Sequence, residues 1–191
     1  VNVLRRLPDG RWQGDMFDGL GYVRAMEKNG CVLTGKRALL VGAGGAGSAI
    51  AHSLVLADVS ELAIHDPDDQ RRQSLIDRLN SLKLGKVTQG SPDPSGFDVA
   101  VNATPIGMQG ADRDELAFSV TTIAHASAVI DAVAFPWHTP LITAAQAAGL
   151  PVVTGADIFV RQAALQFARY TGVTPTADQV ERAAAHARAG A

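Results

Sequence analysis

A strand, a glycine-rich turn, a helix and a second strand follow one another in residues 39–66, and this unit most constrains the fold. Gly42 lets the chain turn tightly, Gly44 leaves room for a ligand to approach the backbone, and Gly47 lets the helix pack near the strand. The helix begins near Gly45, and its positive N-terminus can bind a pyrophosphate. The predicted phosphate loop comprises Gly42, Ala43, Gly44, Gly45, Ala46 and Gly47. The unit therefore predicts a dinucleotide-binding βαβ fold.

A carboxylate at the end of the second strand indicates which dinucleotide binds. Asp66 follows the apolar run ELAIH, where it can accept hydrogen bonds from both ribose hydroxyls of an adenosine. A 2′-phosphate there would meet a negative charge, so we expect NAD as the preferred cofactor. Arg71 and Arg72 leave NADP as the alternative, because a guanidinium can bind a 2′-phosphate. The other interpretation of the motif is an ordinary parallel sheet with a glycine-rich turn and a helix-capping Asp66.

Charge and composition exclude several classes of partner. The formal net charge is −2 and the pI is near 6.2, so neither nucleic acid nor an anionic membrane surface is an expected partner. The apolar runs are strand-sized, which predicts no membrane span. Cys31 is the single cysteine, which excludes an intramolecular disulfide and favours a reducing, cytoplasmic location. We expect a soluble monomer or homodimer that binds small molecules.

The histidines and tryptophans do not indicate a site. The histidines show no metal-ligand spacing, so we expect no metal; they are His52, His65, His125, His138 and His186. Trp12 and Trp137 are interpreted as packing residues.

Strand and helix patterns alternate along the chain. A hairpin is predicted over residues 1–15 around the turn Pro8-Asp9-Gly10, and a helix over 18–29. Further strands are predicted at 38–41, 62–65, near Val87, at 98–102, 128–133 and 151–153, and further helices at 45–57, 68–82, 139–149, 156–171 and 176–189. This order predicts an α/β fold with a doubly wound, mostly parallel sheet, as in a Rossmann-type NAD(P)-binding domain.

Five ordered motifs extend the glycine signature over essentially the whole chain. They are GDMFDGLG (14–21), GAGGAG (42–47), NATPIGM (102–108), DAVAFPWHTPL (131–141) and GADIFVRQAALQF (155–167). In order and spacing they resemble the cofactor-binding half of the shikimate dehydrogenase family, whose corresponding motifs include GDNTDGxG and NATSxGM. Asn2 resembles the asparagine of that family's GAxNT segment.

The resemblance implies a reaction and a domain organisation. The reaction would be reversible hydride transfer between NAD(P) and a ring alcohol or ketone, such as shikimate, quinate or a related cyclic hydroxy acid. In the family, a Lys and an Asp handle the hydroxyl proton; the Asp corresponds to Asp18, and the Lys lies in an N-terminal substrate domain that this chain lacks. Residues 1–17 would then be a hairpin remnant leading from that missing domain, and residues 18–191 the dinucleotide-binding domain with its C-terminal helices.

The resemblance also assigns the remaining site residues. Asn2 and Gln162 are the expected substrate-binding residues. Beyond the phosphate loop, the expected cofactor-binding residues are His65, Asp66, Asn102, Thr104, Ala132 and Gly155. Asn102 and Thr104 end a strand at the carboxyl edge of the sheet, where ligands of open α/β folds bind; the other interpretation of both is a turn.

Several positions depart from the family pattern. Met16 and Phe17 replace the Asn and Thr before the catalytic Asp, Ala134 replaces a Tyr, and Ile158 replaces a Met. A pocket that loses hydroxyl donors should lose affinity for a polyhydroxylated acid. Two alternatives follow: a related enzyme acting on a less polar cyclic alcohol, or a non-catalytic dinucleotide-binding regulatory module in which Asp18 is only a helix N-cap.

Overall fold

The sheet topology confirms the doubly wound α/β fold. The computed structural model describes residues 1–123 and 126–189. Its larger sheet has the strand order β5-β4-β3-β6-β7-β8, with every neighbouring pair parallel. The strands are β3 (Arg37–Val41), β4 (Glu61–His65), β5 (Lys86–Gln89), β6 (Val99–Asn102), β7 (Ala128–Asp131) and β8 (Val152–Val153). Successive strands are added toward one edge of the sheet from β3 to β5 and toward the other edge from β6 to β8. Ligands of such folds bind at this switch point between β3 and β6.

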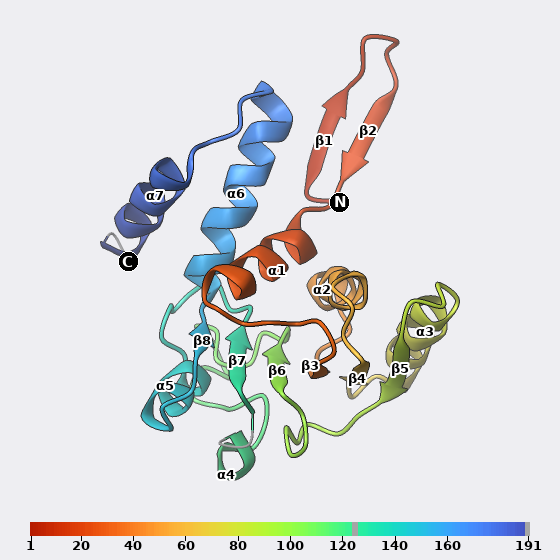
Figure 1. Cartoon of the computed structure of the whole chain (residues 1–191), viewed down its shortest axis with the longest axis vertical. Coiled ribbons are helices and arrows are strands. Elements are labelled where there is room, and N and C mark those ends of the chain that lie inside the picture. Colours follow the sequence, from red (N-terminus) through yellow and green to blue (C-terminus); the bar gives the residue numbers. More distant parts are fainter. Residues whose placement is uncertain (124–125, 190–191) are drawn as a thin grey trace.

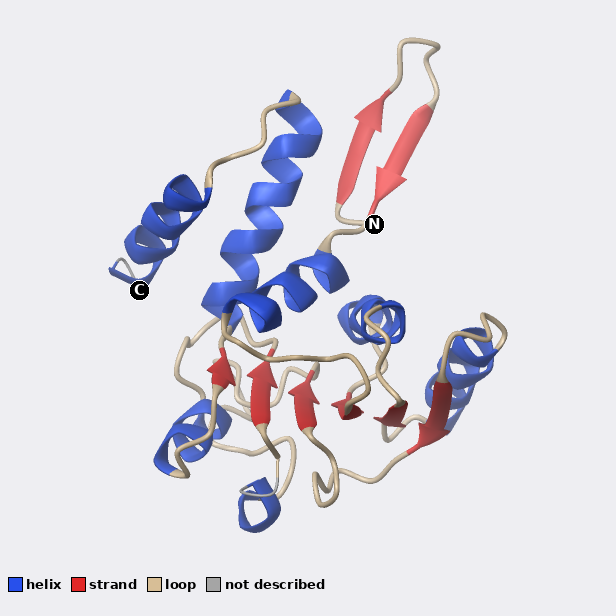
Figure 2. Ribbon diagram, in the orientation of Figure 1, coloured by secondary structure: helices blue, strands red, loops and turns tan. Residues whose placement is uncertain are grey.

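The strands read as continuous apolar runs because both faces of the sheet are covered. All four residues of β6 and of β7 are buried, as are the last four of β3. One core lies under α1 (Asp18–Lys28), α2 (Gly45–Leu56), α3 (Asp69–Asn80) and α6 (Gly155–Thr171), and the other under α4 (Val120–Ile123) and α5 (Pro140–Ala147). Figure 2 shows these two helical layers on either side of the strands.

Helix ends in this layer follow local sequence signals. Thr154 caps α6 in a reciprocal capping box with Asp157, and Gly172 ends the same helix with a left-handed φ of 75°. Thr139 caps α5 ahead of Pro140. These signals place both helices within one residue of their predicted starts. The four-residue helix α4 was not predicted, because so short a segment has too few positions to show a helical period.

The N-terminal hairpin stands apart from the sheet. Strands β1 (Val3–Arg6) and β2 (Trp12–Asp15) pair antiparallel and project beside the end of α6 (Figure 1). Arg169 of α6 donates to Asp15 at 2.5 Å, which ties the hairpin to the helical layer. Trp12 is 68% exposed, so its interpretation as a packing residue is wrong for the described part of the chain.

Two further expectations from the sequence concern membrane spans and histidines. Among the described residues, no helix is both long and apolar enough to cross a membrane. His125, one of the histidines considered as metal ligands, lies outside the described residues. The last helix, α7 (Ala177–Ala189), returns along α6 and completes the chain as described.

Candidate functional site

The phosphate loop lies between the carboxyl ends of β3 and β6, and two of its glycines are required by packing. Gly42 has a φ of +105°, and a Cβ built on it would lie 2.7 Å from the Ala103 carbonyl oxygen. A Cβ on Gly47 would lie 2.0 Å from the Gly42 carbonyl oxygen. These two positions hold α2 against the ends of the strands, so a side chain at either would separate helix and sheet.

The other two glycines of the loop have free space in front of them. A Cβ on Gly44 or on Gly45 would meet no atom within 4 Å. Gly44 is the N-cap of α2, where no side chain accepts from the first N–H groups, and the first turn carries no acidic residue. An open backbone with uncapped, positively polarised N–H groups suits a pyrophosphate, so the loop fits a dinucleotide.

Asp66 lies next to this loop and is held there by backbone hydrogen bonds. Its Oδ2 accepts from the Ala43 N–H at 2.7 Å and its Oδ1 from the Asp68 N–H at 2.9 Å. The residue is only 3% exposed, and the guanidinium of Arg71 lies 3.6 Å from Oδ2. The carboxylate therefore adds a fixed negative charge beside the loop, with a half-exposed cation able to move away from it.

The neighbours of Asp66 have different parts in the structure. Arg72 donates to the Asp66 carbonyl oxygen at 2.8 Å and pairs with Asp69 at 2.7 Å, so its side chain is used in closing the turn. His65 is half-buried at the end of β4, and its carbonyl oxygen accepts from the Gly42 N–H at 2.8 Å. Of the two arginines that could bind a 2′-phosphate, Arg71 is the freer one.

A buried polar network stands behind the ends of β6 and β7. The Asn102 amide donates to the Ile106 carbonyl oxygen at 3.1 Å and to Asp131 at 3.0 Å, while its oxygen accepts from the Thr104 hydroxyl at 2.7 Å. Asp131 also accepts from the Thr139 hydroxyl at 2.6 Å. Asn102 is fully buried, so this network shapes the loop after β6 and leaves Asn102 no exposed atom.

Ionisation of the Asp131 carboxyl is unfavourable at this buried position. Burial raises the pKa of its carboxyl above the usual value, while hydrogen bonds from Thr139, Val133 and Asn102 pull the pKa back down. Sequence reasoning missed this residue. The sequence shows that Asp131 ends an apolar strand, but its place beside Asn102 depends on β7 pairing with β6.

Ala132 and Gly155 lie along the same edge. The Ala132 N–H donates to the Asn102 carbonyl oxygen at 2.8 Å. A Cβ on Gly155 would lie 1.9 Å from the Val133 carbonyl oxygen, so only glycine lets α6 start against this strand end. Both residues are placed where the backbone forms one wall of the carboxyl edge.

Asn2 and Asp18, far apart from each other in the sequence, meet at the start of α1. The Asn2 Nδ2 donates to Asp18 Oδ1 at 2.6 Å, and the Asn2 Oδ1 accepts from the Phe17 N–H at 3.0 Å. Phe17 is the N-cap of α1, and no side chain there makes a capping bond. The interpretation of Asp18 as a helix cap is therefore wrong. Its carboxylate is half-buried and held by Asn2 instead.

Gln162 lies on α6 where that helix crosses α1. A Cβ on Gly21 would lie 3.1 Å from the Gln162 Cβ, so a side chain at position 21 would crowd α6 at this crossing. Gly21 is one turn after Asp18, so the crossing brings Gln162 to the same part of the molecule. Met16, the bulky replacement in the family motif, is exposed just ahead of Asp18.

Tyr22 is a second residue that sequence reasoning missed. Its hydroxyl is buried and has no hydrogen-bond partner within the described residues. Burial raises its pKa well above the usual value, and the charges of Asp131 and Asp18 raise it further. The hydroxyl thus stays neutral between the two carboxylates, and its helical position predicted only a core residue.

Shikimate and quinate/shikimate dehydrogenases resemble this chain in sequence. It is 34% identical to a protein named shikimate dehydrogenase (NADP(+)) from Stenotrophomonas maltophilia, over 94% of this chain and 64% of that protein. It is 33% identical to quinate/shikimate dehydrogenase (NAD(+)) from Corynebacterium efficiens, over 94% of this chain and 65% of that protein. The chain thus spans less than two thirds of the length of these relatives. No model of a protein family matches it.

Solved structures give the same result. Quinate dehydrogenase from Corynebacterium glutamicum in complex with NAD aligns with a TM-score of 0.83 at 29% identity, over 98% of this chain and 67% of that one. Shikimate 5-dehydrogenase from Thermus thermophilus in complex with NADP(H) and shikimate aligns with a TM-score of 0.82 at 28% identity, over 96% and 67% of the two chains. By sequence and by fold, this chain belongs to the shikimate dehydrogenase family and corresponds to part of its longer members.

Proposed function

We propose that this chain is the dinucleotide-binding part of an NAD(P)-dependent oxidoreductase of the shikimate dehydrogenase type. The reaction is reversible hydride transfer between the cofactor and a ring alcohol or ketone of a cyclic hydroxy acid. The observation that carries this proposal is the open phosphate loop at Gly44 and Gly45, together with the Asn2 and Asp18 pair at the start of α1, a helix that packs on α2. When bound, the nicotinamide supplies or accepts the hydride.

Asp18 is the proposed catalytic residue of this chain. Asn2 holds Oδ1 of its carboxylate, and Oδ2 has no hydrogen-bond partner within the described residues. That oxygen can accept a hydrogen bond from a substrate hydroxyl and so help to position its proton. Asn2 and Gln162 are the proposed substrate-binding residues on either side of it.

The second half of the proton-handling pair is proposed to lie outside this chain. None of Lys28, Lys36, Lys83 or Lys86 occupies a position that matches the family's catalytic Lys. We propose that residues 1–17 lead from an N-terminal substrate domain and residues 18–191 bind the cofactor. The 191-residue chain should then bind dinucleotide with little turnover, as the alternative of a non-catalytic regulatory module also requires.

NAD is the proposed cofactor, with NADP as the alternative. The buried Asp66 carboxylate next to the loop favours two ribose hydroxyls over a 2′-phosphate. The remaining proposed contacts are the phosphate loop, His65, Thr104, Ala132 and Gly155. Asn102 acts as a positioning residue, because its side chain is used within the network behind the loop.

The cellular setting and assembly are proposed from composition. The half-buried thiol of Cys31 has a raised pKa because of burial, which fits an unreactive residue in a reducing cytoplasm. We propose that the protein is a monomer or homodimer. We also propose that Met16 and Phe17 favour a substrate that is less polar than shikimate where it faces these two side chains.

Replacing Asp18 in the native full-length protein tests the catalytic proposal. We expect Asp18→Asn to lower kcat for the preferred alcohol by about 100-fold or more, because general acid–base groups contribute about that much. The dissociation constant for NADH should change less than about twofold. Asp178→Asn is the matched control, since that largely exposed carboxylate pairs with Arg182 on α7 and touches none of the proposed site residues. Equal turnover by Asp18→Asn and the parent protein would contradict the catalytic role and favour the regulatory module.

A further inference from the structure

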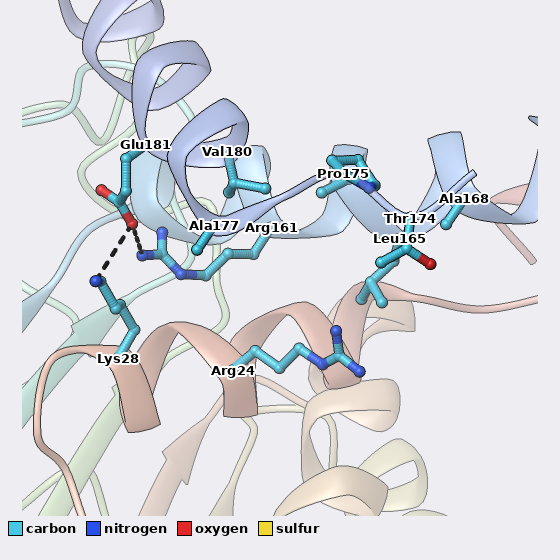
Figure 3. A pocket seen from close by; sticks show the side chains of 11 residues that line it. Arg24, Lys28, Arg161, Leu165, Ala168, Thr174, Pro175, Ala177, Val180 and Glu181 are labelled. Carbon is cyan, nitrogen blue, oxygen red and sulfur yellow. Dashed lines mark hydrogen bonds and ion pairs between the residues drawn. The ribbon is translucent and has the colours of Figure 1, made fainter.

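A cavity lies away from the phosphate loop, between α1, α6 and α7. Its volume is about 320 Å³, and it opens between the helix that carries Asp18 and the two C-terminal helices. Figure 3 shows Arg24 and Lys28 of α1 facing Arg161 of α6 and Glu181 of α7 across it. None of the proposed catalytic or cofactor-binding residues lines this cavity.

The cavity lining carries more positive than negative charges. Three cations, Arg24, Lys28 and Arg161, line it together with one carboxylate, Glu181. Glu181 lies 3.1 Å from the Arg161 guanidinium and 3.7 Å from the Lys28 ammonium, so both cations share a single anion. Arg24 has no ion-pair partner among the described residues, and its guanidinium lies apart from Glu181 near Leu165 (Figure 3). The cavity therefore has an excess positive charge that an anion would neutralise.

Part of this charge is built into the structure. The side chain of Arg161 is only 9% exposed, and its guanidinium also donates to the Asp157 carbonyl oxygen at 2.9 Å. A buried and doubly held guanidinium has little freedom to move toward solvent. It keeps its charge at one end of the cavity, while Arg24 provides a second, more adaptable cation.

Apart from Thr174, which carries a hydroxyl, the rest of the lining is apolar. It consists of Ala164, Leu165, Ala168, Pro175, Ala177 and Val180. These side chains offer hydrocarbon surface and no hydrogen-bonding group, so they favour a ligand with an apolar body. An inorganic anion or a sugar phosphate would leave that surface without a matching partner.

We propose that this cavity binds a small amphipathic carboxylate, with its carboxylate on Arg24 and its hydrocarbon or aromatic part on the apolar wall. A guanidinium and a carboxylate form a paired, charge-assisted contact. The site is independent of the proposed oxidoreductase function, because it shares no lining residue with the phosphate loop or with Asn2, Asp18 and Gln162.

Titration of 3-phenylpropanoate into the ¹⁵N-labelled chain tests this site. We expect saturable shifts of the amide signals of Arg24, Leu165 and Val180, without shifts at Gly44. Its neutral analogue, 3-phenylpropanamide, should bind about tenfold more weakly because it lacks the charge. Inorganic phosphate should also bind at least about tenfold more weakly, because it lacks the apolar part.

Two variants separate the charge from the shape of the cavity. Arg24→Gln, at an exposed position, should weaken 3-phenylpropanoate binding about tenfold. Ala177→Leu should abolish binding, because the larger side chain of this lining residue would fill part of the cavity. Arg182→Gln is the control, since Arg182 pairs with Asp178 and does not line the cavity. The same affinity in Arg24→Gln as in the parent, or equal binding of the amide or of phosphate, would overturn the proposal. Absence of any shift at millimolar 3-phenylpropanoate would overturn it as well.

Discussion

At the scale of single residues, Asp66 has a structural role next to the phosphate loop, and we propose that it also sets cofactor selectivity. Its carboxylate joins the phosphate loop to the end of β4 through the Ala43 N–H, and it lies next to the expected position of the adenosine ribose. Arg71 lies close enough to offset that charge and exposed enough to turn away. Cofactor preference should therefore depend on the balance between Asp66 and Arg71.

The Asp66→Asn variant tests that balance. Asparagine keeps the size of the side chain and one acceptor for the Ala43 N–H, but it removes the charge that opposes a 2′-phosphate. We expect the ratio of the NADPH and NADH dissociation constants to shift toward NADPH by about tenfold, or about 1.4 kcal/mol. Fluorescence titrations with both cofactors measure this ratio. Asp77→Asn, at an exposed carboxylate further along α3 that accepts from Gln73, should leave the ratio unchanged. An unchanged ratio in Asp66→Asn would refute the assignment.

The raised pKa of Asp131 predicts a particular dependence of stability on pH. Because burial raises the pKa of this carboxyl in the folded state, the folded chain binds the proton more tightly than the unfolded chain does. Asp131 therefore favours folding below its unfolded pKa, and this contribution is lost as pH rises through the folded pKa.

Thermal unfolding of the parent protein and of Asp131→Asn, followed from pH 4 to pH 7, measures this contribution. The difference in Tm, parent minus variant, should decrease as pH rises, since only the parent loses the contribution of Asp131. The other titrating groups are common to both proteins and cancel. A difference that is constant or grows with pH would show that the pKa of Asp131 is not raised.

At the scale of secondary-structure elements, the crossings of α1 decide how the proposed catalytic residue is placed. A Cβ on Gly19 would lie 2.1 Å from the Ala49 carbonyl oxygen of α2, and Gly21 sets the approach to α6. Gly19 follows directly after Asp18, and Gly21 comes three residues after it. The packing of α1 on its two neighbours thus fixes where Asp18 lies.

Gly19→Ala should disturb this packing. Its added methyl group has no room against the α2 backbone, so we expect a loss of about 1–3 kcal/mol in the free energy of unfolding. Urea denaturation followed by circular dichroism measures the loss. Gly45→Ala is the control, because the same methyl group would lie in open space and α2 should be as stable or more stable. Equal stability of Gly19→Ala and the parent would mean that the crossing can adjust.

At the scale of the whole molecule, the fold could be predicted because its signals are local and repeated. The glycine loop, the buried strands and the helix caps each act within a few residues, and β3, α2 and β4 begin and end within one residue of their predicted bounds. The roles expected of Asn2 and Asp18 came only from a family resemblance, and their contact was not predicted, since no local pattern joins them. Asp131 and Tyr22 were missed because their roles depend on strand order and on burial between elements.

The exposed hairpin also belongs to this scale. Leu4 and Trp12 are 53% and 68% exposed on a two-stranded sheet that Arg169 and Tyr170 contact from the end of α6. Periodicity shows that a strand has an apolar face, but what covers that face is set by the rest of the protein. For this reason the sequence could suggest a packing role for Trp12, although nothing in the described part of the chain covers most of its side chain.

The measurement that most directly tests dinucleotide binding at the glycine loop is calorimetric titration of NADH into the 191-residue chain and its Gly44→Asn variant. Gly44 has an extended backbone that asparagine can adopt, and an asparagine N-cap should satisfy the open N–H groups of α2 that a pyrophosphate would otherwise bind. We predict saturable binding to the parent chain and at least about tenfold weaker binding to the variant, whose Tm is unchanged or higher. Equal affinity of the two proteins, or no binding of NADH or NADPH to the parent at millimolar concentration, would contradict the account.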